Sequence, residues 1–401
     1  MIGFPGIETL SVPTPSKIVM LVADGLGGVA HPEKGRSEME VASLPNLDRL
    51  AKQSACGRTI PVLPGIAPGS GPGHLALFGY DPLKYFIGRG VLEALGIDAP
   101  IREGDVAARG NFCTVDEDGL LTDRRAGRIP TTESTPLCQL LNSIEVDTVE
   151  TIVLPVQDYR FVLLIRGEGL SDRISETDPQ RTGAPPLLVR AFAPEAERTE
   201  VAANVFLQRS AEILHDRKIA NMVLLRGFSK IPQFPPMGNA YNLNPAAIAA
   251  YPMYRGLAHV IGMKVIPTGH SFDDELDTLN KHFNEHDFFY IHYKPADAAG
   301  EDGDFEAKVH ALEELDKRIP RLEELNPDVL VIAGDHSTPS IMASHSWHPV
   351  PMMIRSSLTR GEGVSEFTER ACSSGPLGTF SAEHLMLQVL SHAGKLSKYG
   401  P

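Results

Sequence analysis

Residues 329–336 read VLVIAGDH, an apolar run that ends in Gly334, Asp335 and His336. A short apolar run closed by a glycine is typical of a strand that is buried on both faces, as in a parallel sheet covered by helices. In open α/β sheets, ligands bind beyond the carboxyl ends of the strands. We therefore expect Asp335 and His336 to lie at the functional edge of an α/β sheet.

Two further runs have the same form. Residues 18–25 read IVMLVADG and place Asp24 directly after the run, and residues 288–297 read FFYIHYKPAD and place Asp297 shortly after it. A single aspartate at a strand end is commonly a helix cap or a turn residue. Three aspartates at one predicted edge, one of them followed by a histidine, favour a metal site instead.

Two loop positions offer further metal donors. His345 lies in residues 345–349, HSWHP, and Glu301 follows Asp297 by four positions. A helix that began near Asp297 would place both carboxylates on one face. Carboxylate and imidazole donors without thiolates suit Mn²⁺, Mg²⁺ or Zn²⁺ rather than an iron–sulfur or copper centre.

A candidate nucleophile lies in residues 68–74, PGSGPGH, ahead of a helix-like LALF segment. Glycines let the backbone turn sharply around Ser70, and a helix that starts there would present N–H groups to an anion. The alternative interpretation is a flexible loop of glycine and proline. Because a serine hydroxyl is a weak nucleophile near neutral pH, we expect the metal site to activate Ser70.

Apolar runs alternate with helical stretches along much of the chain, which predicts an α/β fold with a sheet core covered by helices on both faces. The other runs predicted as buried parallel strands are Phe161–Ile165, Met222–Leu225 and Val260–Ile266, and the helical stretches include Asn46–Lys52 and Ala307–Arg318.

The middle of the chain differs from its two ends. From about residue 110 to about residue 245 it is rich in prolines and in charged, hairpin-like segments. The metal-ligand candidates lie on both sides of this stretch, which favours an insertion. We expect residues 1–110 and 246–401 to form a metal-binding core domain, and residues 111–245 to form a second domain inserted into it.

Arginines in and beside the insert could clamp a phosphorylated substrate, because a guanidinium binds phosphate or carboxylate through two hydrogen bonds. Each could equally be a solvated surface residue. Arg160 is the strongest candidate, since it opens a predicted strand beside Asp158. The residues predicted to contact substrate are Arg109, Arg128, Arg160, Arg173 and Lys294; Arg124, Arg125 and Arg181 are further arginines of this region.

Composition excludes several partners. The 37 basic and 51 acidic residues give a net charge of -14, which argues against nucleic acid or an anionic membrane as the main partner. The four cysteines lack a CxxC spacing, and residues 1–16 lack a basic segment followed by an apolar run, so we expect a cytoplasmic protein. No P-loop, GxGxxG turn or GxSxG elbow is present, so nucleotide binding has no sequence support. The oligomeric state stays open.

Taken together, ordered segments along nearly the whole chain resemble the cofactor-independent phosphoglycerate mutases of the archaeal type, in the alkaline phosphatase superfamily. The segments are VADG at 22–25, PNLD at 45–48, GSGPGH at 69–74, GRG at 88–90 with Glu93 beyond it, RGNF at 109–112, DRRAGR at 123–128, LSDR at 170–173, TDP at 177–179, AGDH at 333–336 and PVP at 349–351.

The resemblance implies an alkaline-phosphatase-like core with two divalent metals, and it implies that the insert at residues 111–245 is an α+β cap domain that clamps the substrate. One metal would be held by Asp24, Ser70, Asp335 and His336, and the other by Asp297, Glu301 and His345. The family usually has a histidine where this chain has Glu301, and the added carboxylate should favour Mn²⁺ or Mg²⁺ over Zn²⁺. His348 stands where relatives often carry Asp or Asn, and it is a candidate for supporting a ligand.

The implied reaction interconverts 3-phosphoglycerate and 2-phosphoglycerate through a phosphoserine on Ser70, without 2,3-bisphosphoglycerate and without a nucleotide. Three alternatives stay open: a phosphomonoesterase, a kinase or phosphotransferase acting on another small alcohol such as homoserine, and a metal-binding protein that has lost catalysis. The arginine-rich insert disfavours the first, because hydrolysis needs no clamp on an acceptor.

Overall fold

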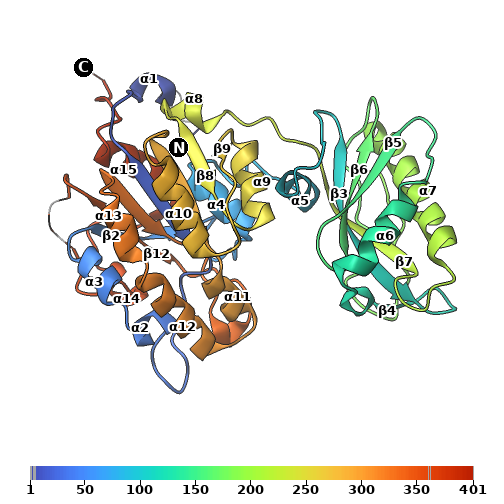
Figure 1. The fold of residues 1–401 in the computed structure, drawn as a ribbon, viewed down its shortest axis with the longest axis horizontal. Coiled ribbons are helices and arrows are strands. Elements are labelled where there is room, and N and C mark those ends of the chain that lie inside the picture. Colours follow the sequence, from blue (N-terminus) through green and yellow to red (C-terminus); the bar gives the residue numbers. More distant parts are fainter. Residues whose placement is uncertain (1, 3–5, 360, 362, 401) are drawn as a thin grey trace. The chain divides into compact units, whose positions relative to one another are not determined.

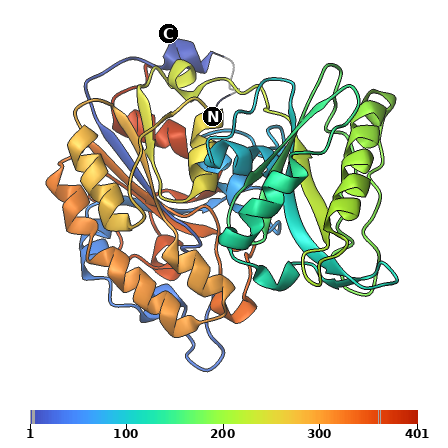
Figure 2. The same ribbon diagram turned by 45° about the vertical axis from the view of Figure 1, so that its right-hand side comes forward.

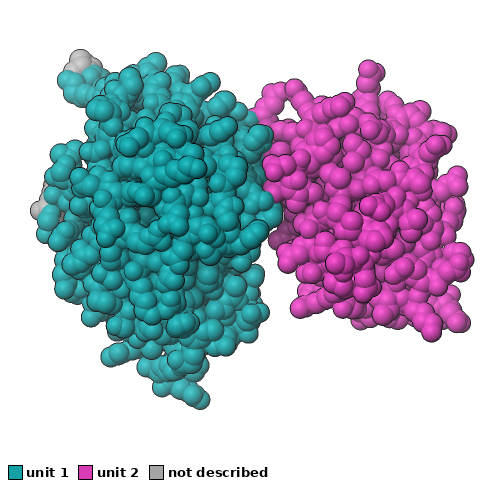
Figure 3. Space-filling view, in the orientation of Figure 1, with its two compact units in different colours: residues 1–86, 234–401 teal, residues 87–233 magenta. Residues whose placement is uncertain are grey.

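The computed structural model describes residue 2, residues 6–359, residue 361 and residues 363–400 (Figure 1). The chain divides into two compact units (Figure 3). Unit 1 comprises Met1–Phe86 and Phe234–Pro401, and unit 2 comprises Ile87–Gln233. Unit 2 is therefore inserted between two parts of unit 1 in the sequence.

The boundaries of unit 2 differ from those expected at residues 111 and 245. The unit begins earlier because helix α5 (Arg89–Gly96) packs on strand β3 (Val106–Val115). A Cβ added at Gly90 would lie 2.4 Å from the carbonyl oxygen of Ala107, so this glycine allows the close approach of helix and strand. Sequence patterns gave no sign of this contact between neighbouring elements.

Unit 1 is built on an eight-stranded sheet with the order β13-β2-β12-β11-β1-β10-β8-β9. Strand β1 pairs in parallel with both β10 and β11, so the carboxyl ends of these three strands meet at one edge. The strands are β1 (Ile18–Ala23), β2 (Ala55–Ile60), β8 (Pro245–Ile248), β9 (Lys264–Val265), β10 (Phe288–Tyr293), β11 (Val329–Ala333), β12 (Val350–Ser356) and β13 (Gly378–Ser381).

Helices cover both faces of this sheet, as the α/β prediction requires (Figures 1 and 2). On one face, alternate residues of β1 join a hydrophobic cluster with α2 (Glu38–Val41), α3 (Pro45–Ala51), α10 (Phe272–His282), α12 (Phe305–Asp316), α13 (Ile319–Glu324) and α14 (Glu369–Cys372). On the other face lie α4 (Ser70–Leu77), α9 (Pro252–Val260) and α15 (Leu385–His392). The ring of Tyr290 on β10 contacts His74 and Phe78 there, at and just beyond α4.

Of the four predicted strands that lie in unit 1, three are confirmed and one is wrong. The runs 18–23, 288–293 and 329–333 are strands with the predicted bounds, and the two predicted helices match α3 and α12 within two residues. The run Val260–Ile266 is not one strand, because α9 extends to Val260 and only Lys264–Val265 is extended. Gly262 lies between them with φ of +81°, a left-handed conformation that suits a helix end.

Unit 2 has an antiparallel sheet of its own. Its strands follow the order β4-β3-β6-β5, and β7 pairs with β3. The runs Phe161–Ile165 and Met222–Leu225 lie in this sheet, so their assignment to parallel strands was wrong. The elements are β3, β4 (Leu121–Asp123), β5 (Glu150–Pro155), β6 (Arg160–Arg166), β7 (Met222–Ser229), α5, α6 (Thr131–Leu141) and α7 (Glu197–Leu214).

A hydrophobic cluster of its own fills unit 2, with Phe112, Phe161 and Phe206 among its buried members. An antiparallel sheet with separate helices is the arrangement expected of an α+β domain. None of the helices in the described part of the chain has the length and apolar composition needed to cross a lipid bilayer.

Candidate metal centre

The three strand-end aspartates meet at one edge of the unit 1 sheet. Asp24 follows β1 directly, Asp335 follows β11 by two residues, and Asp297 lies in the first turn of α11 (Pro295–Glu301), the helix after β10. All three side chains are fully buried. The parallel pairing of these strands with β1 brings the carboxylates together, because it aligns the strand ends.

One group of possible metal ligands surrounds the Nε2 atom of His336. This nitrogen lies 3.2 Å from Asp24 Oδ1, 3.2 Å from Asp335 Oδ2 and 3.1 Å from the Ser70 hydroxyl. Among the described residues, neither of those buried carboxylate oxygens has a hydrogen-bond partner. Buried carboxylate oxygens that lack hydrogen bonds suit a cation, because an unpaired buried charge is otherwise costly.

A second group lies beside the first. His345 Nε2 lies 3.6 Å from Asp297 Oδ1 and 3.3 Å from Glu301 Oε1. Asp297 and Glu301 are four residues apart on α11, as expected from their spacing. The imidazole rings of His336 and His345 stack with centroids 3.6 Å apart, so the two groups are neighbours. Glu301 is the outermost member, since 52% of its side chain is exposed.

Neighbouring groups determine which nitrogen of each histidine is available to a metal. The Nδ1–H of His345 donates to the carbonyl oxygen of Pro68 at 2.9 Å. The Thr338 hydroxyl donates to Asp297 Oδ1 at 2.6 Å, so its oxygen is free to accept from the Nδ1–H of His336 at 2.9 Å. Nε2 is therefore the nitrogen of both imidazoles that faces the carboxylates, which is the orientation that metal-binding histidines use.

Ser70 is the first residue of α4, after Gly69 as the N-terminal cap. Its position at a helix start places backbone N–H groups and the positive end of the helix dipole beside the hydroxyl. Gly73, one turn later, packs directly on the loop after β11: an added Cβ would lie 2.3 Å from the Asp335 carbonyl oxygen. The glycine-rich run thus lets Ser70 approach the ligands closely.

Lys294 contributes a positive charge to the site. Its ammonium lies 3.1 Å from Asp24 Oδ2 and also donates to Asp297 Oδ2. Burial by itself would lower the pKa of Lys294, but the carboxylates of Asp24 and Asp297 outweigh burial and raise it. The residue was predicted to contact substrate; in the structure its ammonium is engaged by two predicted metal ligands.

The pKa values of the aspartates diverge. Burial favours the neutral form of Asp24, but the hydrogen bond from His292 and the charges of His336 and Lys294 hold the pKa of its carboxyl well below the usual range. Burial, together with the negative charges of Asp24 and Asp297, raises the pKa of Asp335 well above that range. Carboxylates this close and this buried repel one another, and a bound divalent cation would relieve that repulsion.

Three residues that contact the candidate ligands were not predicted from the sequence. The Tyr254 hydroxyl and the Nε2–H of His292 both donate to Asp24 Oδ2, and their rings stack with centroids 3.6 Å apart. The Nδ1–H of His74 donates to the Ser70 carbonyl at 2.9 Å and lies 3.1 Å from Asp335 Oδ2. His292 and His74 lie in quoted motifs and could have been found, whereas nothing in the sequence marks Tyr254.

His348, a candidate supporting residue, contacts its own segment. Its Nδ1 lies 3.0 Å from the Ser346 hydroxyl, and its ring stacks on that of Trp347.

The predicted substrate arginines all belong to unit 2. Arg109 lies 3.3 Å from Glu93 Oε1, and burial together with the nearby positive charges of Arg89 and Arg160 lowers its pKa. The Arg109 Nε atom has no hydrogen-bond partner among the described residues. Arg89, Arg109 and Arg160 therefore concentrate positive charge at one place on unit 2. Arg173 instead forms an exposed ion pair with Glu195, and Arg128 is exposed.

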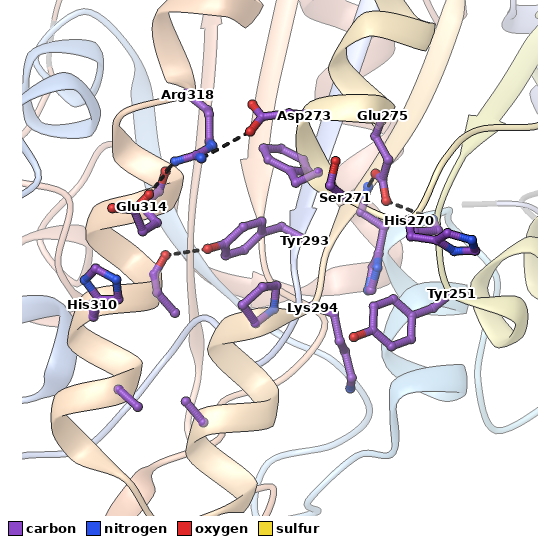
Figure 4. A pocket seen from close by; sticks show the side chains of 17 residues that line it. Tyr251, His270, Ser271, Asp273, Glu275, Tyr293, Lys294, His310, Glu314 and Arg318 are labelled. Atoms are coloured by element: carbon purple, nitrogen blue, oxygen red, sulfur yellow. Dashed lines mark hydrogen bonds and ion pairs between the residues drawn. The ribbon is translucent and has the colours of Figure 1, made fainter. Parts of the chain in front are cut away.

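A cavity of about 540 Å³ lies beside Lys294, between α10, α11 and α12 (Figure 4). Arg318 on its wall is held by Asp273 at 3.1 Å and Glu314 at 2.6 Å. The charges of Arg318, Asp273 and Glu314 are thus paired with one another. Lys294 and His292 also line the cavity, and both bond to Asp24 of the first ligand group.

The approach of α4 to the loop after β11 leads to a prediction. Gly73→Ala should lower the affinity for Mn²⁺ by roughly tenfold and the stability by about 1–3 kcal/mol, because the added methyl group must displace the Asp335 backbone. Calorimetric Mn²⁺ titration and urea unfolding measure both effects. Gly69→Ala is the matched control, since its Cβ would meet only Pro72 at 3.8 Å. Equal behaviour of the two variants would contradict this account of the packing.

Sequence comparisons identify relatives over the full chain. A family model described as 2,3-bisphosphoglycerate-independent phosphoglycerate mutase matches residues 51–220. A probable enzyme of that name from Thermus thermophilus is 48% identical over 402 residues, which is 99% of each chain. Another from Thermosipho africanus is 50% identical over 397 residues, which is 98% of each chain.

Solved structures share the fold. The PH0037 protein from Pyrococcus horikoshii has a TM-score of 0.84 at 24% identity, covering 96% of this chain and 99% of that one. A cofactor-independent phosphoglycerate mutase from Thermoplasma acidophilum has a TM-score of 0.72 at 28% identity, covering 94% of this chain and 100% of that one. The resemblance drawn from the motifs is thus confirmed, and the chain belongs to the family of the 2,3-bisphosphoglycerate-independent phosphoglycerate mutases.

Proposed function

We propose that this chain interconverts 3-phosphoglycerate and 2-phosphoglycerate by passing the phosphoryl group through Ser70, with two divalent metals at the two ligand groups. As a member of its family the chain is an isomerase. The observation that carries the proposed mechanism is the position of the Ser70 hydroxyl, 3.1 Å from His336 Nε2 and beside buried carboxylates.

The donor set supports the proposed metals. Asp24, Ser70, Asp335 and His336 would hold one ion, and Asp297, Glu301 and His345 the other. Part of each set lies in a cluster of ligand atoms within 4.8 Å of one another: Asp24, Asp335 and His336 in one cluster, and Asp297, His345 and again His336 in the other. Such ions would supply charge neutralisation at the phosphoryl group and a lower pKa for the serine hydroxyl. Because oxygen donors predominate, Mn²⁺ is the preferred candidate, with Mg²⁺ and Zn²⁺ as alternatives.

The residues of the chain then have distinct tasks. Ser70 Oγ attacks phosphorus in line, forming an Oγ–P bond as the bond from phosphorus to the 3-oxygen breaks, and the serine proton ends on that departing oxygen. The 2-hydroxyl of the bound glycerate then attacks phosphorus: a bond from the 2-oxygen to phosphorus forms as the Oγ–P bond breaks, and the proton of that hydroxyl returns to Ser70 Oγ. The start of α4 presents N–H groups that favour the anionic phosphoryl group.

The arginines of unit 2 are proposed to bind the anionic groups of this small phosphorylated acid. Support comes from the positive charge of Arg89, Arg109 and Arg160 gathered around Glu93, and from the unpartnered Nε of Arg109. A partly desolvated guanidinium binds a carboxylate or phosphate more strongly than an exposed one does. Arg128 and Arg173 stay in the proposal as weaker candidates, because both are exposed.

We also infer that the protein works in the cytoplasm. All four cysteines are buried and free, which is expected in a reducing compartment.

The reaction can be followed by phosphorus NMR with Mn²⁺ and 3-phosphoglycerate. The wild-type protein should produce 2-phosphoglycerate with little free phosphate, and Ser70→Ala should lower turnover by at least about 10³-fold while still binding Mn²⁺. Ser373→Ala, an exposed serine, serves as the control. Free phosphate as the main product would indicate a phosphomonoesterase, and turnover only with ATP and an alcohol acceptor such as homoserine would indicate a kinase. Substantial activity of Ser70→Ala would remove Ser70 from the mechanism.

The metal preference has a test of its own. Glu301→His should shift the relative affinity from Mn²⁺ toward Zn²⁺ by roughly an order of magnitude, because it replaces a hard oxygen donor with imidazole nitrogen. Competition dialysis with both ions measures the ratio. Glu324→His adds a histidine to the exposed end of α13 and should leave the ratio unchanged. An unchanged ratio in Glu301→His would show that Glu301 is not a ligand.

A further inference from the structure

Lys308 is a fully buried cation that belongs to neither ligand group. It lies on α12, and its ammonium donates to three backbone carbonyls: Gly25 at 2.9 Å, Gly27 at 3.0 Å and Thr338 at 2.7 Å. An ammonium group has three N–H donors, so these bonds use all of them. The first two carbonyls lie in the loop after β1, and the third lies in the loop after β11.

Two carboxylates, of the buried Glu38 and the half-buried Glu369, offset the cost of burying this ammonium. Glu38 accepts from the backbone N–H and the hydroxyl of Ser340, at 2.8 and 2.6 Å. Glu369 accepts from the Gly28 N–H at 2.8 Å and from the Ser37 hydroxyl at 2.7 Å. Burial lowers the pKa of Lys308, and the negative charges of Glu38 and Glu369 oppose that effect. Glu38 thus also binds the backbone of the loop after β11, and Glu369 binds the backbone of the loop after β1.

The loops that Lys308 holds carry ligands of both groups. The Gly25 N–H donates to Asp335 Oδ1 at 3.3 Å, and Gly25 directly follows Asp24. Thr338 bonds Lys308 through its carbonyl and bonds Asp297 and His336 through its hydroxyl. A Cβ at Gly25 would lie 2.7 Å from both the Asp297 Cα and the Thr338 Oγ1. A shift of either loop would therefore move ligands of the two groups relative to each other.

We propose that Lys308 is a positioning residue that sets the spacing between the two metal-ligand groups. It touches neither substrate nor metal ligands directly; it fixes the backbone from which Asp24, Asp335, His336 and the Thr338 hydroxyl project. The inference rests on the proposed function, because it presumes that both groups hold metal ions. Removal of the ammonium should therefore lower the affinity for metal ions, in addition to any decrease in the stability of the fold.

A purely structural role must be separated from this one, because removing one partner of a buried ion network destabilises a protein even where the network has no part in its function. The chain offers a matched control in Lys395, which is equally buried. Its ammonium donates to the Thr14 carbonyl at 2.7 Å and to Asp287 at 3.2 Å. Both partners precede strands, β1 and β10, so Lys395 lies at the sheet edge opposite the ligands.

The test compares Lys308→Met, Lys308→Gln and Lys395→Met in the full chain. Mn²⁺ binding is followed by calorimetry and by the electron paramagnetic resonance signal of free Mn²⁺, and stability by urea unfolding of the metal-free protein. We expect Lys308→Met to weaken at least one Mn²⁺ site by roughly tenfold or more. Lys308→Gln, which keeps two N–H donors without the charge, should weaken it less. Lys395→Met should lose stability but bind Mn²⁺ as the wild type does.

The outcomes separate this inference from the function on which it rests. If the wild type binds two Mn²⁺ ions and both Lys308 variants bind them equally well, Lys308 is only structural and the proposed function stands. If Lys308→Met does not fold, Lys308→Gln decides by the same criterion. A loss of Mn²⁺ affinity in Lys395→Met as large as in the Lys308 variants would also overturn the inference. Failure of the wild type to bind Mn²⁺ would overturn both proposals.

Discussion

The structure depends on the mutual repulsion of three buried carboxylates and on what offsets it. Asp24, Asp297 and Asp335 are brought together because β1 pairs in parallel with β10 on one side and β11 on the other. Desolvation and like charge would drive such carboxylates to their neutral forms. Positive charge must be supplied nearby, and in the protein itself Lys294 and the hydrogen bonds to Asp24 supply part of it.

Surrounding residues hold the Asp24 carboxylate through hydrogen bonds to one of its two oxygens. Tyr254, His292 and Lys294 all bond to one oxygen of Asp24, which leaves its other oxygen facing His336 without a hydrogen bond among the described residues. On the far side, Lys308 holds the loops through their backbone carbonyls. Directed hydrogen bonding of this kind pre-organises a ligand set, so that little rearrangement is needed when a cation binds.

The sequence predicts this edge of the sheet well, because its three central strands are short apolar runs buried on both faces and each is followed within a few residues by a candidate metal ligand. The start of the helix at Ser70 and the one-turn spacing of Asp297 and Glu301 are equally local features. Long-range packing is what sequence patterns did not reveal. Tyr254 reaches Asp24 from α9, near a segment predicted as strand, and Lys308 is buried although lysine on a helix is usually solvated.

The arginines mark the limit of prediction from residue type alone. Arg109 and Arg160 are near each other because β3 and β6 are paired, which requires knowledge of strand order in unit 2. Arg173 has the same side chain but pairs with Glu195 on the surface. The domain boundary also could not be predicted from residue type, because α5 joins unit 2 through the contact of Gly90 with β3.

We propose that the two ligand groups bind a pair of cations next to Ser70. Crystals grown with Mn²⁺ and measured at the manganese absorption edge would reveal the positions of such ions. We expect two anomalous peaks per chain, one contacting Asp24, Asp335 and His336 and the other contacting Asp297, Glu301 and His345, with the Ser70 oxygen beside them. Peaks elsewhere, or no peak at these residues, would contradict it.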